Sequence, residues 1–140
     1  MIQRIQSLWL LAASAAAFTT LKVSFYSGHK IGDALKTYQF LNATSTIPII
    51  VLSVAVAITS LVLIFLYKDR SLQIKITLAA LAVSILTLVL YFFELKKFVQ
   101  GESSFDLTCV FAFVIPVLLF LAFRGIYKDE KLVKSVDRLR

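Results

Sequence analysis

Four stretches of the chain contain no charged residue over the length that a membrane-spanning helix needs: residues 5–21, 47–67, 76–93 and 107–123. A helix rises about 1.5 Å per residue, so about 17 to 25 residues cross the hydrocarbon core of a bilayer. Within each stretch, apolar residues occupy all sides of the helix, and such a helix is buried or faces lipid. The pattern predicts an all-α membrane protein, with a four-transmembrane-helix bundle as one domain over residues 1–140.

The first stretch has a second interpretation. Arg4, a short apolar core and the alanine triplet at residues 15–17 also describe a secretory signal peptide. The apolar run nevertheless continues through Leu21, with only Thr19 and Thr20 interrupting it. We therefore expect a retained span.

Composition supports a membrane location. Of the 140 residues, 59% are hydrophobic and 16% are charged, whereas soluble domains have about 45–50% apolar and about 25% charged residues. The net charge of +7 comes from lysines and arginines at the ends of the apolar runs. They form no continuous basic face with interleaved aromatics, so nucleic acid is not an expected partner. The single cysteine excludes an intramolecular disulfide.

The basic residues are divided unevenly between the two predicted sides of the membrane. Five of the fifteen fall on the side of the 22–46 and 94–106 segments. The other ten fall on the side of the N-terminus, the predicted 68–75 loop and the C-terminal tail from residue 124 to 140: Arg4, Lys68, Arg70, Lys75, Arg124, Lys128, Lys131, Lys134, Arg138 and Arg140. Because cytoplasmic loops carry an excess of basic residues, both termini are predicted to be cytoplasmic.

The predicted outer loop, residues 22–46, contains a weak strand signal. Val23 and Phe25, and later Tyr38 and Phe40, alternate with polar residues across a glycine-containing interruption at residues 28–32. This pattern allows a small strand pair that caps the bundle. An isolated two-stranded hairpin is only marginally stable, so whether the strands form stays open.

Small residues four apart recur within the spans. Such spacing lets helix backbones approach closely, and hydroxyl side chains can hydrogen-bond across the interface. The pairs are Ala12 and Ala16, Ala13 and Ala17, Ser53 and Ala57, and Ala80 and Ser84, with Ser60 and Thr87 as hydroxyl donors. They predict close packing but do not distinguish contacts within one chain from contacts between copies, so the oligomeric state stays open.

No catalytic, cofactor-binding or metal-binding constellation stands out. His29 is the only histidine and is expected to be a solvated loop residue. Cys109 is expected to act as a small hydrophobe near the end of the fourth span. Glu94 adjoins the third span and can reach the interface. We therefore expect a protein that is not an enzyme and needs no cofactor or metal.

The tail, residues 124–140, has an amphipathic helical pattern. One arc of a helical wheel is apolar, with Ile126, Leu132, Val133, Val136 and Leu139, and Lys128, Lys131, Lys134 and Arg138 lie opposite. Such a helix can lie on an anionic lipid surface or dock on a cytoplasmic partner. The alternative is a solvated continuation of the fourth span, stabilised by pairs such as Glu130 with Lys134. Asp129 falls within the apolar arc and weakens the lipid-surface interpretation.

The two ends of the chain resemble a known family. The motifs are MIQRIQS at residues 1–7, SLQIK at residues 71–75 and IYKDEKLVKSVDRLR at residues 126–140. They resemble those of small four-span membrane proteins of Bacteroidota catalogued as domain of unknown function 4293, and the resemblance covers essentially the whole chain. It implies an inner-membrane location but supplies neither an activity nor a site.

Two functions are compatible with these patterns. The first is a non-enzymatic scaffold or accessory subunit whose cytoplasmic termini contact the bilayer or a protein partner through Arg4, Lys128, Lys131, Lys134, Arg138 and Arg140. The second is a small-solute or lipid transporter or channel, for which only serine and threonine could line a polar path. A membrane enzyme is least expected, because no acid–base or nucleophile pair lies within a span.

Overall fold

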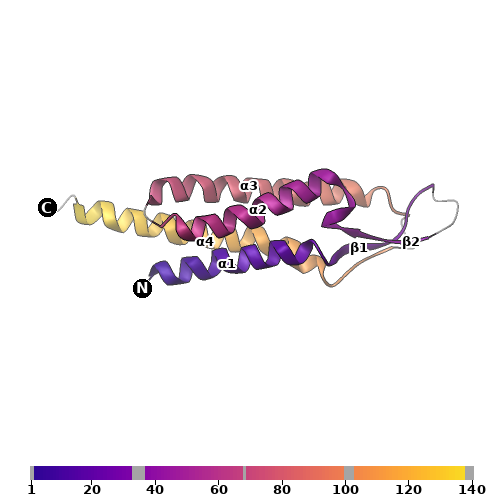
Figure 1. The fold of residues 1–140 in the computed structure, drawn as a ribbon, viewed down its shortest axis with the longest axis horizontal. Coiled ribbons are helices and arrows are strands. Elements are labelled where there is room, and N and C mark those ends of the chain that lie inside the picture. Colours follow the sequence, from indigo (N-terminus) through magenta and orange to yellow (C-terminus); the bar gives the residue numbers. More distant parts are fainter. Residues whose placement is uncertain (1, 33–36, 68, 100–102, 138–140) are drawn as a thin grey trace.

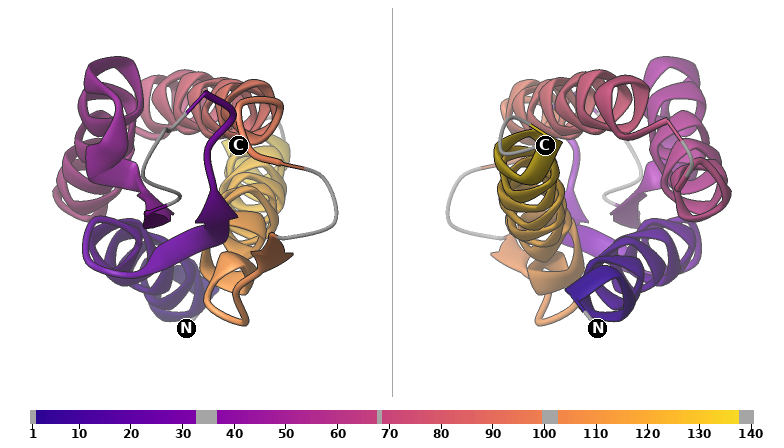
Figure 2. Two further views of the ribbon diagram at one scale, coloured as in Figure 1. Left: turned by 90° about the vertical axis from the view of Figure 1, so that its right-hand side faces the viewer. Right: turned by 90° about the vertical axis from the view of Figure 1, so that its left-hand side faces the viewer.

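The protein is described by a computed structural model that covers residues 2–32, 37–67, 69–99 and 103–137. It is mostly helical, with four helices: α1 (Ile2–Thr20), α2 (Ile47–Phe65), α3 (Arg70–Leu95) and α4 (Cys109–Asp137). The helix α1 packs against α2 and α4, and α3 packs against the same two helices. Figure 2, viewed along the bundle, shows the four helices around a common axis.

The two ends of the bundle differ (Figure 1). At one end, here called the sheet end, the chain forms β1 (Ser24–His29), β2 (Tyr38–Asn42) and β3 (Ser104–Phe105). At the other, here called the turn end, α2 ends, α3 begins after a short connection, α1 begins and α4 ends. Helix α4 reaches past the other helices at the turn end.

The strands form one antiparallel sheet in the order β2-β1-β3, and the 3-10 turn η1 (Ala43–Ser45) leads from β2 into α2. The predicted strand pair is therefore confirmed, and the expectation of an all-α fold is wrong at this end. The third strand was not predicted. It has two residues, which is too short for an alternating pattern to be recognised in a sequence.

A bulge in β1 fixes the sheet to the bundle. The pairing of β1 with β2 shifts between Ser24 and Tyr26, so Phe25 is the extra residue, and such bulges redirect a side chain. Phe25 is buried and stacks on Tyr91 of α3, with ring centroids 4.4 Å apart. Stacked aromatic pairs contribute about 0.5–1.5 kcal/mol beyond the area they bury. This contact holds the sheet over the ends of the helices.

Two helix boundaries differ from the predicted ones. Helix α3 begins at Arg70, so most of the predicted 68–75 loop is helical. Arg70 and Lys75 end the charge-free stretch, but an exposed charge does not end a helix. Helix α4 continues from Cys109 through Pro116 to Asp137. The predicted tail is therefore a continuation of the fourth helix as far as residue 137.

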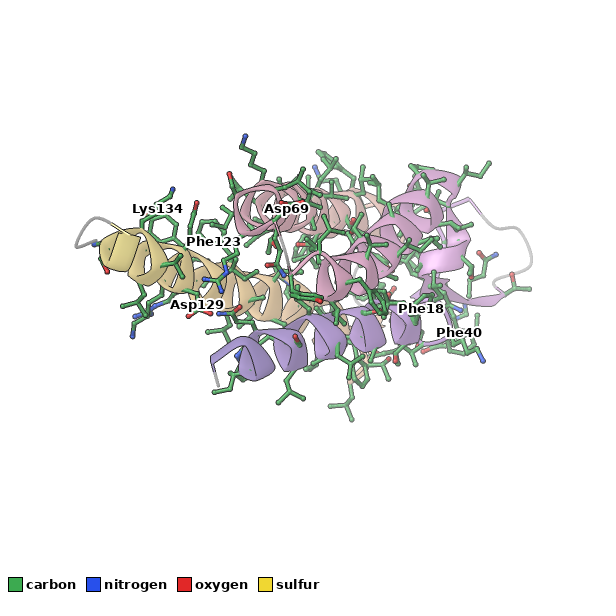
Figure 3. All side chains as sticks on the ribbon, turned by 60° about the vertical axis from the view of Figure 1, so that its left-hand side comes forward. Phe18, Phe40, Asp69, Phe123, Asp129 and Lys134 are labelled. Carbon is green, nitrogen blue, oxygen red and sulfur yellow. The ribbon has the colours of Figure 1, made fainter. Side chains whose placement is uncertain are left out.

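Small residues lie inside the bundle and large apolar residues outside. Ala13, Ala17, Ser53, Ala57, Ser60, Ala80 and Ser84 are buried, so the predicted small-residue contacts form within the chain, while Ala12 is exposed. Outward-facing apolar side chains include Leu8, Val51, Ile58, Leu78, Phe120 and many others, and Figure 3 shows side chains projecting all around the helices. Three helices, α2, α3 and α4, are long and apolar enough to cross a membrane, while α1 has a shorter apolar stretch, Ile5–Thr20. This arrangement is consistent with a membrane protein.

Candidate functional site

A pocket of about 530 Å³ lies at the turn end and is here called the turn-end pocket. Every helix of the bundle contributes to it. Its lining residues are Gln6, Ser7, Leu8 and Leu11 of α1, Ile64 of α2, Tyr67 after it, Arg70 and Gln73 of α3, and Ile126 and Asp129 of α4. Small-molecule sites typically measure about 300–1,000 Å³ and combine apolar walls with a few polar groups. The turn-end pocket has this character.

One wall of the pocket holds a buried polar contact between α1 and α4. The Gln6 side-chain amide donates a hydrogen bond to Asp129 Oδ2 at 2.6 Å. Gln6 is 6% exposed and Asp129 is 9% exposed. A hydrogen bond to a charged group contributes about 1.5–3 kcal/mol, and a buried carboxylate without a donor is costly. Figure 3 locates Asp129 on the part of α4 that lies beside α1.

A glycine makes this contact possible. A Cβ atom at Gly125 of α4 would lie 2.9 Å from Gln6 Cγ, closer than carbon atoms pack. Because Gly125 has no side chain, the Gln6 side chain can lie flat against α4 and reach Asp129, one helical turn further along. Gly125, Gln6 and Asp129 therefore act as one unit.

On another side of the pocket, a second buried side-chain amide joins α3 to α2. The Gln73 side-chain amide of α3 donates a hydrogen bond to the Leu63 carbonyl of α2 at 2.9 Å. Carbonyls in the last turn of a helix have no partner within that helix. Gln73 is buried, so this bond satisfies such a carbonyl and fixes α2 to α3 near their connection. The pocket lies between these two polar contacts.

The pocket also contains charges of both signs. The Asp129 carboxylate comes from α4 and the Arg70 guanidinium from the start of α3. Among the residues whose side chains the structure describes, neither makes an ion pair. Tyr67, which is largely exposed, supplies an aromatic ring to the same lining. The pocket therefore has an anionic group and a cationic group available on separate helices.

In the described part of the bundle, apolar core residues lie between the turn-end pocket and a second cavity. The second cavity, of about 20 Å³, lies nearer the sheet end and is lined by hydroxyl groups including those of Thr20, Ser84 and Thr87. Its size is close to that of one water molecule. Leu10, Leu63 and Leu119 are fully buried in the core cluster that lies between the two cavities along the helices.

The three predicted contact residues whose side chains are described lie on α4 and are not part of the described pocket lining. Lys128, Lys131 and Lys134 are exposed on α4. Lys134 Nζ lies 2.8 Å from Glu130 Oε1, the pair expected from the spacing, and this carboxylate raises the pKa of Lys134. The side chain of Arg4, and residues Arg138 and Arg140, lie outside the described part of the chain.

The structure also describes the surroundings of the three other residues that the sequence analysis considered. His29 ends β1 instead of lying in a loop, and it contacts Tyr38 edge-on. Cys109 begins α4 and is partly buried. Glu94 pairs with Lys97 at 2.7 Å. The described residues contain no group of three or more potential metal ligands.

Sequence reasoning did not select Gln6, Gln73 and Asp129 as a site, although two signals were present. Asp129 falls within an otherwise apolar arc of α4, and Gln6 is a polar residue within the first apolar stretch. A polar residue on an apolar face indicates a buried partner, but the sequence did not indicate which helix supplies it. The apolar arc itself is divided, because Ile126 is buried whereas Leu132 and Val133 are exposed.

Comparison with known proteins identifies a family and nothing more. The family described as Domain of unknown function (DUF4293) matches residues 2–139. Searches of curated proteins and of solved structures found no match.

Proposed function

We propose that this chain, which belongs to the DUF4293 family, is a non-enzymatic scaffold or accessory subunit of a bacterial inner membrane. In this proposal it crosses the bilayer four times, with both termini in the cytoplasm. Its turn end contacts a protein partner or the lipid surface, and the exposed end of α4 provides the contact.

The observation that carries the proposal is the extension of α4 beyond the bundle. Gln6 meets Asp129, so the α4 residues after about 133 have no α1 residue beside them. The last turns of α4, which include this extension, form a continuous helix with Lys128, Lys131 and Lys134 exposed. Leu132 is 50% exposed and Val133 is 43% exposed on the same segment. A rigid helix with a mixed basic and apolar surface suits docking on an acidic partner or an anionic leaflet.

Helix length supports the proposed topology. The 19 residues of α2 span about 28 Å, which matches a hydrocarbon core of about 30 Å. Helix α1 also has 19 residues and packs along α2 and α4, so a membrane that contains its neighbours would contain α1 as well. The excess of basic residues at the turn end favours the cytoplasmic side for that end.

Transport has less support as a function. A pore or carrier needs a polar path or a binding site accessible from both sides. The fully buried leucines between the two cavities, Leu10, Leu63 and Leu119, oppose such a path.

Cysteine labelling tests the topology. Cys109→Ser removes the only cysteine, and a new cysteine is then placed at Ser104, in β3, or at Ser135, near the end of α4. Both positions are exposed. A membrane-impermeant maleimide should label S104C in intact spheroplasts and S135C only after permeabilisation. The reverse pattern would contradict the proposed orientation, and labelling of both without permeabilisation would contradict a crossing by α4.

Charge reversal tests the partner surface. The triple variant K128E/K131E/K134E should lose a partner that co-purifies with the wild-type protein from gently solubilised membranes. The matched control, K22E/K30E/K96E, reverses three lysines at the sheet end and should retain it. Equal recovery of the same proteins with both variants would refute the proposed docking surface.

A further inference from the structure

We propose that the turn-end pocket binds one phospholipid whose headgroup carries both a phosphate and a primary ammonium group. In this arrangement the ammonium group meets the Asp129 carboxylate and the phosphate meets the Arg70 guanidinium. The acyl chains leave the pocket over the exposed leucines of α1. This inference goes beyond the proposed scaffold function and depends on the membrane insertion that the proposal includes.

The two charged groups of the pocket determine which kind of headgroup we propose. Asp129 is 9% exposed, and its described partner is the neutral amide of Gln6. A buried carboxylate is normally paired with a cation, and no described side chain forms an ion pair with it. Arg70, which α3 contributes to the lining, likewise has no described acid within ion-pair distance. A zwitterion supplies the missing partner to each group, whereas a purely anionic headgroup would be repelled by Asp129.

The need of the carboxylate for a hydrogen-bond donor further limits which headgroup fits the pocket. A primary ammonium group has three N–H donors and can bond directly to a carboxylate oxygen. A quaternary ammonium group has none and is usually bound over aromatic faces. The described lining contains one aromatic ring, that of Tyr67, which is too few for an aromatic cage. The chemistry of the pocket therefore favours an ethanolamine-type headgroup over a choline-type one.

The position of the pocket favours a lipid over a soluble zwitterion. The pocket lies at the end of α2, whose length matches one hydrocarbon core, so it would lie at the level of the headgroups. Leu8 and Leu11 of α1 are 61% and 51% exposed and form part of the lining. They extend the pocket towards the depth of the acyl chains. Tyr67 at the rim is typical of aromatic residues at membrane interfaces.

Lipid titration of the purified full-length protein tests the inference. The protein in maltoside micelles is titrated with phosphatidylethanolamine, phosphatidylglycerol or phosphatidylcholine of identical acyl chains, and bound lipid is counted by native mass spectrometry. The expected result is one tight site that favours phosphatidylethanolamine by about tenfold or more, the size of effect that one charged hydrogen bond provides. Equal affinity for the three lipids would overturn the proposal.

Two variants separate the roles of the charges. Asp129→Asn keeps the shape and an oxygen that can accept the Gln6 hydrogen bond, and it should remove the preference for phosphatidylethanolamine over phosphatidylcholine. Arg70→Gln should weaken the binding of all three phosphate-containing lipids. Their matched controls, Asp69→Asn and Lys75→Gln, change exposed charges outside the lining and should bind like the wild type.

Failures of the two proposals can be distinguished. If D129N and R70Q, folded by circular dichroism and gel filtration, retain wild-type selectivity, the lipid inference is overturned. Cysteine labelling from the predicted sides would leave the topology intact in that case. Labelling from the wrong sides would overturn the topology without changing the lipid selectivity measured in micelles.

Discussion

The hydrogen bond between Gln6 and Asp129 offers the sharpest test of how the turn end is stabilised. Gln6→Met keeps the approximate side-chain volume but removes the donor. The bond is short, 2.6 Å, it joins two buried side chains, and its acceptor is a carboxylate. We expect its loss to reduce the free energy of unfolding by about 1.5–3 kcal/mol, because the remaining carboxylate stays buried without its donor.

A double-mutant cycle isolates the interaction. Asp129→Met alone should also destabilise, because the Gln6 amide then lacks an acceptor. The double variant Q6M/D129M contains neither polar group, so none is left unsatisfied. Its loss in the free energy of unfolding should therefore be smaller than the sum of the two single losses by about 1–3 kcal/mol. Stability is measured by reversible unfolding in mixed micelles, with Lys131→Met, an exposed change on α4, as control. Additive losses, within about 0.5 kcal/mol, would refute a direct contact.

Three further predictions concern the glycines and the exposed ion pair. Gly125→Ala should destabilise by about 1–3 kcal/mol through overpacking against Gln6, whereas in a Gln6→Ala background the same change should stabilise through its higher helix propensity; thermal unfolding measures both. Gly28→Ala should lower the thermal unfolding midpoint, since its Cβ would collide with Ser103 Cβ and force β1 from the neighbouring chain, and S103G should partly restore it. Exchanging the charges of Glu130 and Lys134 should leave the midpoint unchanged at neutral pH, because the Lys134 side chain is 71% exposed and a pair with a solvated partner contributes little. Since Glu130 raises the pKa of Lys134 above its usual 10.5, any contribution of the original pair is present below that pH and disappears as the pH rises through the raised value.

The helices could be predicted from the sequence because their signal is long and local. A charge-free stretch locates the central part of each helix, and α2 begins at Ile47, the first residue of its stretch. The start of α3 was missed because charge ends a hydrophobic window without ending a helix. Strand β3 was missed for a different reason. Its two residues form a strand only because Tyr26 and Ser27 lie beside them, and that pairing depends on distant parts of the chain.

The candidate site was predictable only in outline. The basic residues and the family motifs directed attention to the turn end, where the pocket also lies. It did not reveal the pocket, because Gln6, Gln73 and Asp129 are far apart in the chain and belong to three helices. The contact between Gln6 and Asp129 joins residues 123 positions apart. Such a pairing follows from the packing of α1 against α4, which no local pattern contains.

The described hydroxyl groups inside the bundle donate to backbone carbonyls. Ser60, Thr77 and Thr87 each donate to a carbonyl one turn back in their own helix. Ser14 is different, because it donates across to the Ala57 carbonyl of α2 and so joins two helices. In each case the hydroxyl hydrogen is donated to a backbone carbonyl. The buried hydroxyl group is therefore hydrogen-bonded, and it has no donor left for a solute. The Asp129 carboxylate and the Arg70 guanidinium have no such backbone partner among the described bonds, and they are the groups that a ligand can engage.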